Sequence, residues 1–174
     1  GPCSSYCIKE LAKYVKVTIL YYNPNIEPIE EYNKRKETQI NLIKDYQKEG
    51  IDVDYIDVDY ENEVYRNYVL GLENEVEGGS RCTKCFTLRL TKTASLAAAL
   101  NYDFFATTLT VSPHKNSKII NEIGFEIEKK LKIRFLPSDF KKREGYKKSI
   151  EYSKEYELYR QDYCGCLFSK RKED

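Results

Sequence analysis

The sequence VKVTILYY at residues 15–22, followed by Asn-Pro-Asn at residues 23–25, decides the fold. A short run rich in β-branched and aromatic side chains is typical of a buried strand, and Asn-Pro-Asn is typical of a turn. Residues 30–48 then carry apolar side chains at near-helical spacing and stop before Gly50, a residue type that commonly ends a helix. This region therefore predicts a strand, a turn and a helix in succession.

The same alternation continues along the chain. Ser112 and Pro113 resemble a helix cap and first helical residue, and the apolar stripe of the helix after them comprises Ile120, Ile123, Ile127 and Leu131. Strands that alternate with helices imply parallel βαβ units, so we predict an α/β fold with a doubly wound, mostly parallel sheet and helices on both faces. Further strands are predicted at residues 53–58, 104–109 and 133–136, and further helices at residues 4–14, 61–72, 87–100 and 147–159.

The chain length is typical of a single domain, which we assign to residues 1–174. Cys3 would lie at the end of a strand that precedes residue 1. We expect this first strand to be missing from the sequence, because its neighbours in the sheet would otherwise lack a partner.

The charges are balanced, with 29 Lys and Arg against 28 Asp and Glu, for a formal net charge of +1. Contact with nucleic acid would therefore depend on local basic patches. No apolar run approaches the roughly 20 residues that cross a bilayer, and no secretory signal pattern is present. We expect a soluble, unexported protein of the cytoplasm.

Six cysteines fall in three close pairs, which in a reducing compartment favours metal binding or redox catalysis over structural disulfides. Cys82 and Cys85 form a CxxC motif between a Gly-rich loop and a predicted helix start, with Arg81 and Lys84 beside them. Cys164 and Cys166 form a CxC motif near the C-terminal end, where a disulfide would be strained and easily reduced.

Other kinds of site have less support. The four cysteines could instead hold one structural zinc ion, but CxC is an unusual zinc spacing. His114 is the only histidine, and we interpret it as a surface or cap residue. Gly78, Gly79 and Ser80 lack the spacing of a phosphate-binding loop, so we expect no nucleotide cofactor.

Basic residues cluster in the last part of the chain. Such runs are usually solvated surface, but a basic tail beside a reactive dithiol would suit docking of a polyanion such as tRNA. The candidate tRNA-binding residues are Arg81, Lys170, Arg171 and Lys172.

Taken together, these motifs resemble the cobalamin-independent epoxyqueuosine reductases of the QueH family. Each motif alone is weak, but their order and spacing are specific to that family. The matching segments are Gly-Pro-Cys at residues 1–3, YNPNI at 22–26 with Glu31 and Arg35 after it, RCTKC at 81–85, TTLTVSPHK at 107–115 and YRQDYCGC at 159–166.

The resemblance implies a HUP-like fold, a 4Fe-4S cluster without cobalamin, and reduction of epoxyqueuosine to queuosine at the wobble position of tRNA. It assigns Cys82 and Cys85 to the cluster and makes Cys164 and Cys166 a redox-active disulfide pair. Two further cluster ligands would be adjacent cysteines upstream of residue 1, in whose absence Cys3 is a candidate. A second iron ion and the identity of the electron donor stay open.

Removing the epoxide oxygen also requires an acid. Asp139 and Asp162 are catalytic candidates by their location, as is Tyr163. Two other functions stay open: a zinc-stabilised RNA-binding module, and a cluster-free thiol oxidoreductase that uses Cys164 and Cys166 alone.

Overall fold

The computed structural model describes residues 2–170 of the chain. Helices alternate with short strands along most of this range, as the sequence predicts. The elements are α1 (Pro2–Leu11), β1 (Val17–Leu20), α2 (Ile29–Lys48), β2 (Val53–Ile56), α3 (Asn62–Tyr68), α4 (Ser80–Ala99), β3 (Phe104–Phe105), the 3-10 helix η1 (Leu109–Val111), α5 (Ser117–Leu131), β4 (Arg134–Phe135), α6 (Gly145–Glu155) and the 3-10 helix η2 (Leu167–Ser169).

The strands pair in parallel and each pair is joined by a helix. β1 pairs with β2 in the register Val17–Val53, and α2 connects them. β3 pairs with β4 in the register Phe104–Arg134, and α5 lies between them in the chain. The α/β class is therefore confirmed, but the sheet is small: the described strands form two separate two-stranded sheets.

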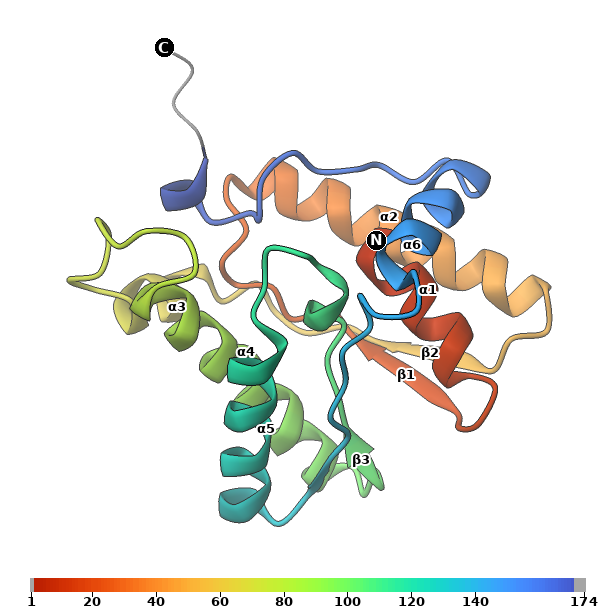
Figure 1. The fold of residues 1–174 in the computed structure, drawn as a ribbon, viewed down its shortest axis with the longest axis horizontal. Coiled ribbons are helices and arrows are strands. Elements are labelled where there is room, and N and C mark those ends of the chain that lie inside the picture. Colours follow the sequence, from red (N-terminus) through yellow and green to blue (C-terminus); the bar gives the residue numbers. More distant parts are fainter. Residues whose placement is uncertain (1, 171–174) are drawn as a thin grey trace.

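Each strand pair has its own apolar core. Around β1 and β2, the fully buried side chains of Ile8, Leu42 and Tyr46 bring α1 and α2 together. Figure 1 shows α1 and α6 side by side near α2, although they come from opposite ends of the chain. This half of the molecule therefore depends on contacts between residues far apart in sequence.

The second core lies between α4, α5 and the β3–β4 pair. Leu90 and Ala94 of α4 meet Ile120 of α5 there. Gly124 faces Phe135, and a Cβ atom at Gly124 would lie 2.3 Å from the Phe135 ring. Glycine at this point lets the aromatic ring of β4 pack directly on the α5 backbone.

Two helix starts differ from the prediction by more than two residues. α4 begins at Ser80, seven residues before the predicted start, so Cys82 and Cys85 lie inside the helix. α5 begins after Asn116, whose side chain accepts hydrogen bonds from the backbone of Lys118 and Ile119, and not after Ser112. Within residues 2–170, no helix is long and apolar enough to cross a membrane.

Candidate active site

Four of the six cysteines line one small cavity. Cys82 and Cys85 come from the first turns of α4, whereas Cys164 and Cys166 come from the segment after α6. The cavity volume is about 20 Å³, which is room for about one water molecule. All six cysteines are free thiols. Besides the cysteines, Asn25, Tyr65, Arg81, Phe86, Arg89, Lys115 and Ser169 line it.

The two α4 cysteines have different surroundings. Cys82 is half-buried, and its Sγ accepts a hydrogen bond from the Gly78 backbone N–H at 3.2 Å. Cys85 is 7% exposed, and burial raises the pKa of its thiol to about 11, although Arg89 and Lys115 oppose this. The thiolate stabilisation expected at a helix start therefore does not hold for Cys85, because one further helical turn carries it into the core.

Each sulfur of the CxC motif lies beside a hydroxyl group. The Tyr65 hydroxyl of α3 donates to Cys166 Sγ at 3.0 Å, and Ser169 Oγ lies 2.9 Å from Cys164 Sγ. Burial raises the pKa of the Cys166 thiol, and the hydrogen bond from Tyr65 works against this rise. The two thiols are therefore not equivalent: Cys166 is buried and accepts from Tyr65, and Cys164 is more exposed.

Three cationic side chains line the cavity, with no carboxylate among the described residues that do so. Arg89 donates to the Tyr22 carbonyl and to Asn23 Oδ1, which ties α4 to the loop after β1. Lys115 lies over the Phe86 ring, with Nζ 5.7 Å from the ring centroid. These cations act to lower the pKa values of the cavity thiols, but burial outweighs them at Cys85 and Cys166.

Arg81 lies inside the protein and not on its surface. It is 1% exposed, and its Nη1 donates to the carbonyls of Leu72, Glu73 and Glu75. Arg81 thus holds the loop between α3 and α4 in place. The predicted contact with tRNA would require this guanidinium to leave its buried position.

Two of the residues that line the cavity carry a buried polar atom without a partner among the described residues. Asn25 Oδ1 and Arg81 Nε are buried without a hydrogen-bond partner, and both residues line the cavity. Together with four thiols, the ligand type that binds iron–sulfur clusters, these atoms fit a bound group in their chemistry. Within residues 2–170, however, no three His, Cys, Asp or Glu side chains lie in an arrangement that would hold a metal ion as they stand.

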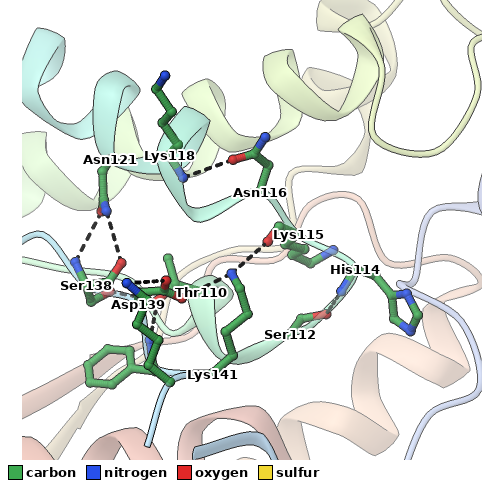
Figure 2. Close-up of polar contacts among 12 residues, drawn as sticks. Thr110, Ser112, His114, Lys115, Asn116, Lys118, Asn121, Ser138, Asp139 and Lys141 are labelled. Carbon is green, nitrogen blue, oxygen red and sulfur yellow. Dashed lines mark hydrogen bonds and ion pairs between the residues drawn. The ribbon is translucent and has the colours of Figure 1, made fainter.

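The segment of residues 107–115 lies next to the cavity and is held by a network of polar contacts (Figure 2). Thr110 Oγ1 lies 2.7 Å from Ser138 Oγ, and Lys141 Nζ donates to the Lys115 carbonyl at 3.3 Å. Asp139 pairs with Lys141 at 3.1 Å and does not line the cavity. Burial acts to raise its pKa, but Lys141 and Lys142 outweigh this and hold the pKa below its usual value.

The other described residues of the predicted site do not line the cavity. Cys3 packs beside Cys7 and Phe140, and Asp162 is exposed to solvent. Neither lines the cavity. Lys170 is exposed, with Nζ 5.7 Å from the centroid of the Tyr163 ring, whereas Arg171 and Lys172 lie outside the described residues.

Tyr65 and Ser169 were missed by the sequence prediction. Tyr65 lies on a helix that reads as polar, and nothing in its neighbourhood indicates a sulfur partner 101 residues away. Asn25 and Lys115 fall in segments that carry the family resemblance, and Arg89 lies four residues after another, which could have drawn attention to them. Only the folded chain assigns these five residues to one cavity.

Comparison with known proteins shows the family of the chain. A family model described as "Epoxyqueuosine reductase QueH" matches residues 1–172. A protein of that name from Streptococcus pyogenes is 42% identical over 98% of this chain and 68% of its own length. Those from Staphylococcus epidermidis and Thermotoga maritima are 41% and 37% identical, over 99% and 86% of this chain and 74% and 77% of their own lengths. The chain therefore belongs to the QueH family of epoxyqueuosine reductases.

Proposed function

We propose that this protein reduces epoxyqueuosine to queuosine at the wobble position of tRNA. Cys164 and Cys166 act as the redox-active dithiol, and Cys82 and Cys85 contribute to a 4Fe-4S site. One observation carries the proposal: the CxxC and CxC motifs, far apart in the chain, line a single cavity in a protein of the QueH family.

The electrons and protons of one turnover balance between the epoxide and the dithiol. Converting an epoxide to an alkene breaks two C–O bonds, consumes two electrons and two protons, and releases water. Closure of the Cys164–Cys166 dithiol to a disulfide supplies both electrons and both protons. An external two-electron donor must then reduce the disulfide before the next turnover.

Cys82 and Cys85 would hold the cluster, which when bound supplies one-electron transfer and a Lewis-acidic iron. The cavity has room for about one water molecule, so its lining must rearrange to admit a cluster. Cys85 must also lose its proton, which its raised pKa makes pH-dependent.

Substrate docking depends on local positive charge in this proposal. Arg89 and Lys115 line the cavity, and Lys170 is exposed at the end of the described chain. Arg89 and Lys115 share the cavity with the dithiol and Lys170 follows it in the chain, so phosphates next to the modified base would approach there. The lowered pKa of Asp139 makes it an ionised ion-pair partner at neutral pH, so we no longer favour it as the acid.

The test is conversion of epoxyqueuosine in tRNA, followed by mass spectrometry of the nucleosides. Anaerobically reconstituted protein with a reductant should produce queuosine. Cys164→Ser and Cys166→Ser should each abolish queuosine formation. Cys7→Ser changes a thiol buried among apolar side chains away from the cavity, so the folded variant should still form queuosine. Absence of queuosine with the wild-type protein would refute the proposal.

Two other functions make different predictions. A zinc-stabilised RNA-binding module would contain one equivalent of zinc and neither iron nor sulfide after anaerobic purification. A cluster-free thiol oxidoreductase would keep its activity in Cys82→Ser and Cys85→Ser variants, whereas the proposed mechanism predicts its loss.

A further inference from the structure

The segment that carries the CxC motif has little regular structure and is held against α2 by a buried arginine. Arg35 of α2 is 8% exposed. Its Nη1 donates to the Cys164 carbonyl and its Nη2 to the Tyr163 carbonyl, each at 3.1 Å. One guanidinium thus binds two successive carbonyls, which fixes the direction of the backbone as well as its position.

Arg35 is itself held from its other side. Its Nε donates at 2.6 Å to Glu31 Oε1, one helical turn earlier in α2. The Tyr159 hydroxyl donates to the same carboxylate, and the centroid of the Tyr163 ring lies 5.0 Å from Arg35 Cζ. The contacts with Glu31 and Tyr163 therefore fix the orientation of the guanidinium independently of its hydrogen bonds to the CxC backbone.

The backbone between the two cysteines lies directly against Arg35. Gly165 has a φ of +113°, and a Cβ atom there would come within 2.7 Å of Ile26 and 3.0 Å of Arg35 Nη1. The Gly165 carbonyl accepts from the Glu27 backbone N–H at 2.8 Å. Glycine thus allows the close approach that brings both cysteine side chains to the cavity.

We propose that Arg35 is a positioning residue that sets Cys164 and Cys166 in the cavity by holding the carbonyls of residues 163 and 164. Arg35 extends from the regular helix α2, so it gives the segment with the CxC motif a fixed point of attachment. Arg35 contacts neither sulfur, so it acts through the backbone. The inference about turnover depends on the proposed function, but the inference about sulfur placement does not.

Thiol alkylation measures the placement without substrate. Metal-free, reduced protein is treated with iodoacetamide, and the rates at Cys164 and Cys166 are read by mass spectrometry. In Arg35→Gln the ratio of the Cys166 rate to the Cys164 rate should rise at least tenfold, because Cys166 leaves its buried position. In Arg35→Lys this ratio should rise less, since an ammonium group can still donate to one of the two carbonyls.

The matched control is Arg160→Gln. Arg160 belongs to the same segment, but its Nη1 donates to Ser153 Oγ and not to the CxC backbone, so the ratio should stay at the wild-type value. An unchanged ratio in folded Arg35→Gln would overturn the proposal. If Arg35→Gln does not fold, Glu31→Gln decides: the ratio should rise by an intermediate factor, and an unchanged ratio would equally overturn it.

Turnover separates positioning from general loss of structure. With epoxyqueuosine-containing tRNA, kcat of Arg35→Gln should fall at least tenfold while KM changes less than threefold, and Arg35→Lys should recover part of kcat. Equal kcat in Arg35→Gln and wild type would overturn the proposal. If the wild-type protein itself is inactive, the proposed function fails and the alkylation ratio still decides the role of Arg35.

Discussion

At the scale of single residues, the Tyr65 hydroxyl is the group that distinguishes the two CxC thiols. Its hydrogen bond to Cys166 Sγ favours the thiolate and so lowers the pKa of Cys166 against the effect of burial. In metal-free Tyr65→Phe, Cys166 should therefore hold less thiolate at a given pH. A hydrogen bond is worth about 1 kcal/mol, so alkylation of Cys166 at pH 8 should slow about fivefold.

The measurement is the pH dependence of the Cys166 alkylation rate, which should move to higher pH in Tyr65→Phe. Tyr68→Phe is the control, because Tyr68 lies on the same helix and is 39% exposed. Coinciding profiles of Tyr65→Phe and wild type would contradict the role of the hydroxyl.

Arg81 is a second residue whose role the fold changes. A buried guanidinium bonded to three carbonyls predicts that Arg81→Lys loses roughly 2–4 kcal/mol in the free energy of unfolding. Urea unfolding measures the loss. Lys84→Gln, an exposed neighbour in the same motif, should unfold like the wild type. A stable Arg81→Lys protein with weakened tRNA binding would instead support the surface role predicted from the sequence.

At the scale of elements, α5 depends on a cap that lies four residues beyond the predicted one. The side chain of Asn116 accepts from the backbone N–H groups of Lys118 at 3.0 Å and Ile119 at 3.3 Å, as Figure 2 shows in part. Asn116→Ala should lower the free energy of unfolding by about 1 kcal/mol. Urea unfolding checks this, with His114→Ala, an exposed residue of the same loop, expected to match the wild type. A larger loss in His114→Ala than in Asn116→Ala would contradict the assigned cap.

At the scale of the whole molecule, Lys9 joins three helices around the first core. Its Nζ lies 4.8–4.9 Å from the ring centroids of Tyr46, Tyr152 and Tyr156, and it pairs with Glu49 at 3.4 Å. Lys9→Met keeps the apolar stem but removes the charge. We expect it to lose about 2 kcal/mol in the free energy of unfolding, because it removes the cation–π contacts together with the hydrogen bond from Lys9 Nζ to the Tyr156 hydroxyl.

Urea unfolding compares Lys9→Met with Lys13→Met. Among the described residues, Lys13 forms an ion pair only with Glu10 and its side chain is more than half exposed, so its replacement should have no measurable effect. Equal midpoints for Lys9→Met and the wild type would show that packing of α1 on α6 does not need the charge.

Local patterns in the chain were enough for the α/β class, the positions of most elements and the pairing of cysteines in two motifs. The predicted helix at residues 30–48 matches α2 to within one residue, because helical periodicity and a terminal glycine are encoded by near neighbours. The first residues of α4 and α5 were less predictable. α5 starts at the Asn116 cap, which short-range patterns do not distinguish from other polar residues, and α4 starts after Gly79 without a side-chain cap.

Three features appear only in the folded chain: the shared cavity of the CxxC and CxC motifs, the hydrogen bond from Tyr65 to Cys166, and the hydrogen bond from Arg35 to the Cys164 carbonyl. Each joins residues about 80 to 130 positions apart, beyond the reach of any periodic pattern. Burial likewise turned Arg81 from a surface candidate into an internal anchor and raised the pKa of Cys85, because both effects depend on neighbours that only tertiary packing supplies.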